Sequence, residues 1–327
     1  MTIPPDMAAW LGTAASTFDA TLTGLAFETI PFLLIGTFLS ALIREFVPDR
    51  TLRKIFPRHP MLSIVVALIS GTFVPICECG TVPLARQLRQ RGLPLSTSVA
   101  FLLAAPLVNP LTIVSTWVAF RGVSDRFVFV RIGFGLAAAF FIAYLVDIES
   151  KRNPGLALVA AAPRFSRIEN EKRPRILIAA ARHVGAPSGF VERLVDALDH
   201  TAVDFLDTGR YLIGGIVFAS VARAFVPPDA IQGALSSTVS AIGIGLLLAF
   251  VLSLCSSADA FVARSLFVPA SYPAAVAFLL LGPMLDLKNT ALLSRFVKPK
   301  YLLPFAAIIG LAAAASAVLS MPILEPR

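Results

Sequence analysis

The sequence predicts an all-α polytopic membrane protein, and three observations support this class. Hydrophobic residues make up 57% of the 327 residues and charged residues only 15%, whereas a soluble domain usually has about a quarter charged residues. The mean hydropathy is +0.80. Apolar runs close to the roughly 20-residue length that crosses a bilayer recur along the chain, and its two halves resemble each other.

Eight apolar runs are candidate membrane segments. In chain order they are IPFLLIGTFLSALI, MLSIVVALISGTFV, STSVAFLLAAPLVNPLTIVSTWVAF, FVFVRIGFGLAAAFFIAYLV, YLIGGIVFASVARAFV, VSAIGIGLLLAFVLSL, YPAAVAFLLLGPML and YLLPFAAIIGLAAAASAVLSMPIL. If every run crossed the membrane completely, each half would have four spans and the two halves would form parallel repeats.

Three blocks of the first half recur in the second half. PFLLIGTFLSALIREFVP aligns with RYLIGGIVFASVARAFVP, and CECGTVPLARQL at Cys77 recurs 178 residues later as CSSADAFVARSL at Cys255. VAFLLAAPLVNPLT at Val99 recurs 177 residues later as VAFLLLGPMLDLKN at Val276. The nearly constant separation predicts a first transmembrane repeat over residues 1–147 and a second over 201–327, joined by a polar cytoplasmic linker at 148–200.

The charges between the apolar runs predict how the repeats are oriented. Basic residues follow both the first run and the second (Arg44, Arg50, Arg53, Lys54 and Arg58, then Arg86, Arg89 and Arg91). Both basic segments belong on the cytoplasmic side, so the second run should enter and leave on the same face. Each half then has three spans plus a re-entrant hairpin, and the odd number of crossings inverts the second repeat, as in many transporters. Eight full spans in parallel repeats are the alternative.

The remaining global features agree with a multi-pass protein of the cell (inner) membrane. MTIPPDMAAW has no basic region typical of a cleaved signal peptide, so the first span should act as the insertion signal. The net charge of +8 is explained by cytoplasmic loops, and we expect no nucleic-acid partner. Three cysteines exclude a disulfide framework.

The tips of the two predicted hairpins carry the most unusual residues. Cys77, Glu78 and Cys79 would lie at membrane depth in the first half, where a carboxylate is costly and therefore points to function. The second half has Cys255, Ser257 and Asp259 at the equivalent place. A returning helix would direct its positive N-terminal end at each tip, which stabilises an anion or thiolate.

The three thiols suggest a soft ligand. Cys77, Cys79 and Cys255 are candidate ligands of a soft metal ion or a trivalent arsenical, and the alternative is that each packs as a small apolar residue. A structural zinc site needs four nitrogen or sulfur ligands, and all three histidines fall in predicted loops.

Polar residues also interrupt the following apolar helix in each half. Asn109 lies between Pro106 and Pro110, which should kink the helix there. Its counterpart segment carries three candidate pathway residues, Asp286, Lys288 and Asn289. The alternatives are a helix–helix hydrogen bond for Asn109 and a mutually neutralising pair for Asp286 and Lys288.

These motifs resemble those of a known family. PICECGTVPLARQLRQRGLP, APLVNPLT and LCSSADAFVARSL are similar to segments of the predicted-permease family that includes the ArsP-type organoarsenical efflux permeases. The resemblance extends over both halves and implies a multi-pass inner-membrane permease, some members of which export trivalent organoarsenicals. By motif position it implies pathway roles for the following residues: Cys77, Glu78, Cys79, Asn109, Cys255 and Asp259.

Together these features predict a permease that is not an enzyme and needs no cofactor. We expect a secondary transporter that exports a small thiophilic solute, such as a trivalent organoarsenical or soft metal, with proton coupling through Glu78, Asp259 or Asp286. The alternatives are a membrane thiol oxidoreductase that uses the Cys-x-Cys pair, a permease for another small anion or sulfur compound, and a channel. The lipid bilayer, the small-molecule or ion substrate and a second copy of the chain in a homo-oligomer are the expected partners.

Overall fold

The computed structural model describes residues 5–46, 51, 55–57, 59–74, 76, 78–152, 190–224, 237–256, 258–268, 271–294 and 299–324, and none of these lies in a strand. The helices are α1 (Pro5–Phe46), α3 (Pro60–Thr72), α4 (Glu78–Gln90), α5 (Leu95–Leu107), α6 (Pro110–Phe120), α7 (Arg126–Arg152), α10 (Phe190–Ala224), α12 (Thr238–Leu252), α13 (Asp259–Phe267), α14 (Tyr272–Met284), α15 (Leu287–Leu293), α16 (Pro299–Leu319) and α17 (Met321–Leu324). The all-α class is confirmed.

Five helical segments of the described chain are long and apolar enough to cross a membrane. They are Gly12–Ile43, Leu95–Phe120, Arg126–Arg152, Tyr272–Leu293 and Lys300–Leu319. Large apolar side chains are exposed along them, for example Phe27 at 82% and Leu303 at 79%. Because water would not tolerate so many exposed apolar residues in continuous stripes, these surfaces face lipid, and the chain is a multi-pass membrane protein.

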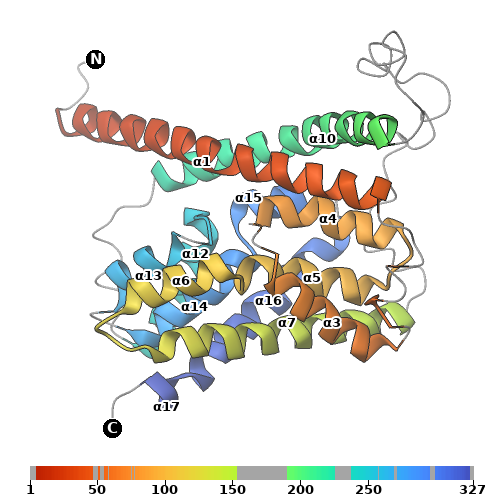
Figure 1. The fold of residues 1–327 in the computed structure, drawn as a ribbon. Coiled ribbons are helices and arrows are strands. Elements are labelled where there is room, and N and C mark those ends of the chain that lie inside the picture. The colour runs from red at the N-terminus through yellow and green to blue at the C-terminus, as the bar shows by residue number, and fades with distance from the viewer. Residues whose placement is uncertain are drawn as a thin grey trace.

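Two apolar helices are too short to cross. α3 has 13 residues and α12 has 15, which at 1.5 Å per residue is about 20 to 23 Å, against a hydrocarbon core of about 30 Å. In Figure 1, α3 runs inward from the right-hand side and α4 runs back toward it, while α12 and α13 lie on the left. The re-entrant hairpins predicted for these two segments stay a prediction.

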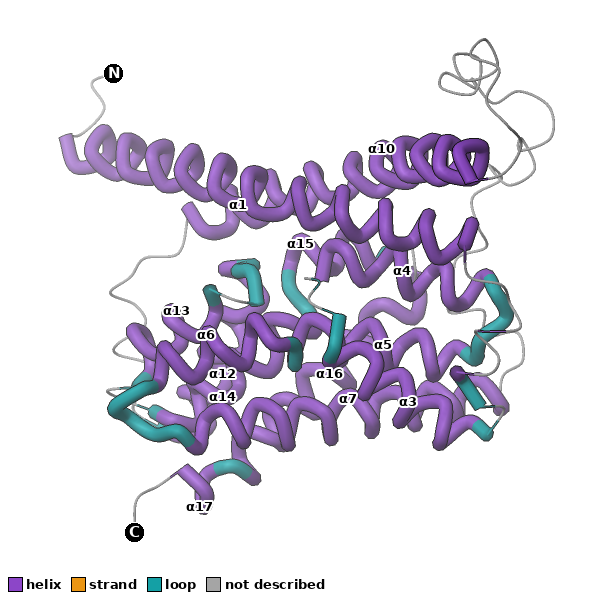
Figure 2. The backbone as a smooth tube through the Cα atoms, in the orientation of Figure 1, coloured by secondary structure: helices purple, strands orange, loops and turns teal. Residues whose placement is uncertain are grey.

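Two of the long segments are interrupted near their middle, as Figure 2 shows for the loop before α15. Between α5 and α6 the chain is extended at Val108 and Asn109, because Pro110 disfavours a helical conformation in the residue before it. Between α14 and α15 it is extended at Leu285 and Asp286. The kink predicted around Asn109 is thus a complete break in the helix, and the second half has the same break.

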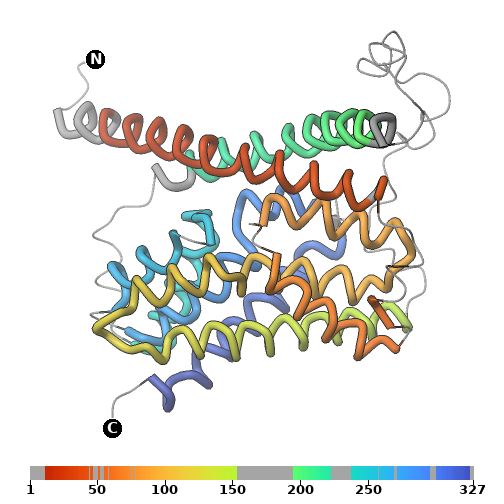
Figure 3. The backbone as a smooth tube through the Cα atoms, viewed as in Figure 1, coloured from red at the N-terminus to blue at the C-terminus, as the bar shows by residue number. Residues whose placement is uncertain are grey.

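α1 and α10 pack along each other and run in opposite directions across one face of the molecule (Figure 3). They lie over α4 and α15. Gly36 of α1 meets the backbone of Gly80 in α4, and Gly215 of α10 meets the backbone of Lys288 in α15. These close approaches need residues without a side chain, so the α1–α10 pair is held tightly over the N-terminal turns of α4 and α15.

The helices extend into both ends of the segment predicted as a linker. Residues 148–152 belong to α7 and residues 190–200 to α10, while residues 153–189 lie outside the described chain. The division into two repeats stays a prediction.

Candidate functional site

Lys288 lies at the centre of the first buried cluster. Its Nζ atom is 2.7 Å from Glu78 Oε1 and 3.0 Å from Asp286 Oδ2, and none of the three side chains is more than 1% exposed. The backbone oxygens of Ser253 and Leu254 accept hydrogen bonds from the same nitrogen at 3.1 and 3.3 Å. The cluster joins α4, the loop after α12 and the start of α15, which lie far apart in the sequence.

The loop after α12 is shaped to face this lysine. Ser253 ends α12 in the left-handed conformation, with φ 48°, which is unusual for a residue with a side chain. Its carbonyl accepts from Lys288, and its hydroxyl accepts from the backbone N–H of Leu287 at 3.1 Å. Ser253 therefore provides one hydrogen-bond acceptor for the Lys288 ammonium group and one for a backbone N–H in the first turn of α15.

The carboxylates of this cluster are not equally supplied with donors. Asp286 caps α15, because its Oδ1 accepts the Asn289 backbone N–H at 2.5 Å, as is usual at a helix N-cap. Glu78 Oε2 and Asn289 Oδ1 are buried and have no hydrogen-bond partner among the described residues. Buried polar atoms without partners are rare and point to a ligand, water or proton.

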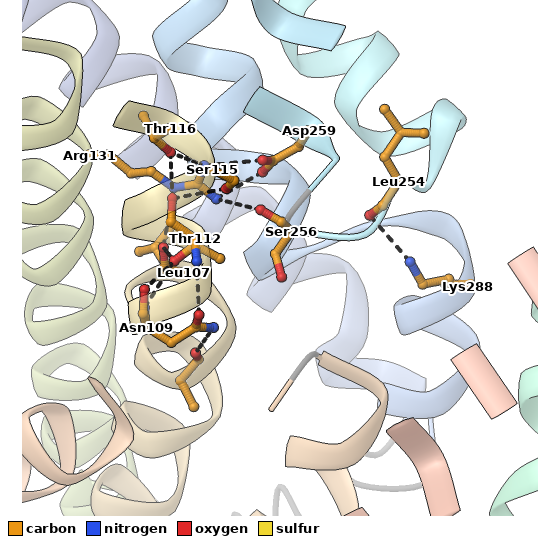
Figure 4. Close-up of polar contacts among 11 residues, drawn as sticks. Leu107, Asn109, Thr112, Ser115, Thr116, Arg131, Leu254, Ser256, Asp259 and Lys288 are labelled. Atoms are coloured by element: carbon orange, nitrogen blue, oxygen red, sulfur yellow. Dashed lines mark hydrogen bonds and ion pairs between the residues drawn. The ribbon is translucent and has the colours of Figure 1, made fainter. Parts of the chain in front are cut away.

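The second buried cluster joins Arg131 of α7 to Asp259 of α13. Arg131 Nη1 and Nη2 donate to the two oxygens of Asp259 at 3.1 and 2.9 Å, a bidentate pair in which neither side chain is more than 2% exposed. The other guanidinium donors reach Thr116 Oγ1 at 2.8 Å, the Ser256 carbonyl at 3.2 Å and the Leu107 carbonyl at 3.2 Å. Figure 4 shows this cluster beside the helix interruption at Asn109.

Asn109 is fully used in capping α6. Its Oδ1 accepts the Thr112 backbone N–H at 2.9 Å, and its Nδ2 donates to the Ala105 carbonyl at 2.9 Å. The Thr112 hydroxyl in return accepts the Asn109 backbone N–H, which completes a capping box. The side chain therefore holds the break in the helix open and lies close to the Arg131 cluster (Figure 4).

The thiols that the structure describes are buried. Cys79 is 0% exposed and Cys255 is 4% exposed, and Cys79 is among the groups that interact electrostatically with Lys288. Cys77 and Ser257 lie outside the described residues. Within the described ranges, no three His, Cys, Asp or Glu side chains form a group that could hold a metal ion.

Arg131 is the site residue that the sequence analysis missed. It lies within the apolar run FVFVRIGFGLAAAFFIAYLV, and a lone arginine inside a membrane helix is itself a signal of function. From the sequence, the only partner considered for Lys288 was Asp286, two positions away. The structure adds Glu78 of the other half as its nearer partner.

Opposite charges buried at interrupted helices of a multi-pass protein are typical of proteins that move solutes or ions across membranes. A family model described as "Predicted permease" (ArsP_1) matches residues 14–321. The chain therefore belongs to this predicted permease family.

Two curated relatives extend the comparison. "UPF0718 protein YcgR" of Bacillus subtilis (strain 168) is 32% identical over 293 residues, which cover 88% of this chain and 92% of the relative. "Putative two-component membrane permease complex subunit" of Streptococcus mutans is 32% identical over 286 residues, which cover 88% of this chain and 89% of the relative. No solved structure matches the chain.

Proposed function

We propose that this permease is a secondary transporter that exports a small thiophilic solute, such as a trivalent organoarsenical or a soft metal ion. The observation that carries the proposal is the burial of two ion-pair clusters at interrupted helices, with Cys79 next to the first. A charged group inside the membrane usually faces a pathway or a partner within it. The family membership favours transport over the thiol oxidoreductase that the Cys-x-Cys pair also suggested.

The architecture that we infer has two inverted repeats of three spans, each with a re-entrant hairpin, and it requires α10 to cross the membrane as a sixth span beside the five segments given above. The short helices α3 and α12, with their returning partners α4 and α13, support the hairpins. Each hairpin acid also pairs with a cation of the other half: Glu78 with Lys288, and Asp259 with Arg131. Eight full spans would require α3 and α12 to cross the membrane completely, and both helices are shorter than the hydrocarbon core.

The thiophilic cargo is inferred from the surroundings of Cys79. An ammonium group beside a thiol stabilises the thiolate, which is the form that binds soft ions. We include Cys77 and Cys255 in the substrate site because of their positions in the two hairpin motifs.

The Streptococcus mutans relative is named as one subunit of a two-component complex. We therefore extend the proposal to an assembly in which this chain works with a second subunit or a second copy of itself. Purification in mild detergent followed by mass measurement distinguishes a monomer, a homo-oligomer and a complex with another protein.

Labelling of introduced cysteines tests the topology. Cysteines substituted at positions 53, 91 and 173 should all react with an impermeant reagent from the cytoplasmic side. Labelling of positions 53 and 91 from opposite sides would eliminate the hairpin and with it the inverted repeat.

Vesicle transport tests the cargo. Everted vesicles should accumulate at least one member of a panel of trivalent arsenicals, soft metal ions and sulfur oxyanions, and more so with a proton gradient. Cys77→Ser and Cys79→Ser should reduce binding sharply, because a hydroxyl is a poor soft-ion ligand, with a smaller loss for Cys255→Ser. Undiminished binding and transport in the Cys77→Ala, Cys79→Ala double variant would contradict a thiol site. Uptake of only a sulfur oxyanion or another small anion would favour the alternative cargo.

A further inference from the structure

The Lys288 cluster has one more acceptor than it has donors. Four oxygens lie within 3.3 Å of Lys288 Nζ: Glu78 Oε1, Asp286 Oδ2 and the carbonyl oxygens of Ser253 and Leu254. A lysine ammonium group has three N–H donors. Three hydrogens are therefore shared among these four oxygens. Glu78 Oε2 lies outside this set and has no hydrogen-bond partner among the described residues.

A count of charges shows that the buried groups lack one positive charge. The charged side chains buried among the described residues are Glu78, Arg131, Asp147, Asp259, Asp286 and Lys288. Asp147 lies near the end of α7 and pairs with Lys151, whose side chain is 62% exposed. The other five comprise three acids and two bases, so the interior would carry one uncompensated negative charge, which is strongly unfavourable away from water.

The neighbouring elements do not supply the missing charge. The helix of Glu78 packs against α1, α5 and α10, and α5, residues 29–43 of α1 and residues 211–222 of α10 carry no charged side chain. Arg131 is engaged by Asp259 through both carboxylate oxygens. The other groups that interact electrostatically with Glu78 are Asp259 of α13 and Asp286 and Lys288 of α15, and Cys79 interacts electrostatically with the same lysine.

The position of the missing hydrogen follows from the donors present. Both oxygens of Asp259 accept from Arg131. Asp286 accepts the Asn289 N–H on Oδ1 and lies against Lys288 on Oδ2. Donors to a carboxylate favour its charged form, and Asp259 and Asp286 each have a donor near both oxygens, whereas Glu78 has a donor near one oxygen only. The dipole of α4 favours a charge on Glu78, but this is a smaller effect than the penalty for burying a third acid beside only two bases.

We propose that Glu78 carries one proton, on Oε2, in this conformation, and that this single exchangeable proton is the one coupled to transport. The transport role rests on the proposed function, whereas the protonation is a property of the folded chain alone. Asp259 is then the partner of Arg131, which donates to both of its oxygens.

Infrared spectroscopy of the purified full-length protein in lipid nanodiscs tests the protonation directly. The C=O stretch of a protonated carboxyl group is resolved from the carboxylate bands. We expect one such band that titrates with pH, that shifts when glutamate is labelled with ¹³C at its side-chain carboxyl, and that is lost in Glu78→Gln. Asp147→Asn is the matched control, since it removes another buried acid and should keep the band.

Three results would overturn the proton site: no protonated-carboxyl band in the folded protein at any pH, a band that does not shift with labelled glutamate, or a band that survives in Glu78→Gln. The isotope shift uses the unaltered chain, so a variant that fails to fold leaves the test intact. For the coupling role, Glu78→Gln should lower gradient-driven uptake to the rate without a gradient while downhill exchange of cargo continues. Gradient-driven uptake in that variant would refute the coupling role. Absence of cargo transport by the unaltered chain would instead refute the proposed function and leave the infrared result standing.

Discussion

The Arg131 cluster and the Lys288 cluster solve the same physical problem in different ways. In the first, one guanidinium group meets both oxygens of Asp259 and three further oxygens, so every strong donor and acceptor is used. In the second, one ammonium group serves two carboxylates and two carbonyls, and Glu78 Oε2 is left without a donor. A balanced buried pair is rigid, whereas an unbalanced one has a reason to bind and release a proton.

The two clusters also differ in what covers them. The α1–α10 pair lies over the Lys288 cluster, and its glycines touch the backbones of Gly80 and Lys288. The Arg131 cluster is instead enclosed by α6, α7 and α13. Access to the Lys288 cluster therefore depends on how tightly α1 and α10 pack, which connects proton exchange to helix packing.

The largest effect should come from breaking the balanced cluster. Arg131→Met leaves Asp259 buried without a counter-charge, and removing one partner of a buried pair typically costs about 3–5 kcal/mol. The free energy of unfolding, measured by titration with a denaturing detergent, should fall by about that amount. The double variant Arg131→Met, Asp259→Asn should recover much of the loss, and Arg152→Met, at the exposed end of the same helix, should change little. Equal losses in the single and double variants would show that the pair is not coupled.

Lys288→Met should destabilise less at low pH than at high pH. Without the ammonium group, Glu78 and Asp286 can be buried only as neutral acids, so the native state binds more protons than the unfolded state and stability falls as pH rises. The free energy of unfolding should be measured at several pH values for Lys288→Met and for Glu78→Gln. The dependence on pH should be weaker in Glu78→Gln. A loss of stability in Lys288→Met that is independent of pH would contradict the difference drawn between the two clusters.

The sequence predicted which residues belong to the two clusters better than it predicted which of them form ion pairs. Glu78, Asp259, Asp286 and Lys288 stood out because charges are rare in apolar runs. The break at Asn109 followed from Pro110, and the repeat placed Asp286 at the matching break. The pairing of Glu78 with Lys288 could not be predicted, because it depends on how α4 and α15 meet in space. Arg131 was passed over as one residue in a long apolar run, although its isolation there was the available signal.

A smaller effect should follow from loosening the cover of the Lys288 cluster. A Cβ atom at Gly215 would lie 2.9 Å from Lys288 Cα and 3.0 Å from the Lys288 carbonyl oxygen, whereas nothing lies within 4 Å of one at Gly214. Overpacking typically costs about 1–3 kcal/mol, so Gly215→Ala should destabilise and should alter the pH dependence of transport. Gly214→Ala is the adjacent control, and alanine favours a helix by about 1 kcal/mol over glycine. Equal stability of the two variants would mean that α10 does not press on α15.

The smallest effect concerns Asn109, which lies beside the balanced cluster. Because its side-chain oxygen caps α6 and its amide donates to Ala105, Asn109→Ala should lower the free energy of unfolding by about 1 kcal/mol, as is typical for a lost N-cap. Asn109→Ser keeps a capping oxygen and should recover most of that stability. Since the Asn109 side chain already has partners for both of its polar atoms, transport per folded molecule should be unchanged in both variants. A normally stable Asn109→Ser variant that has lost transport would instead make Asn109 a substrate contact, and the Arg131 side of the molecule would then belong to the pathway as well.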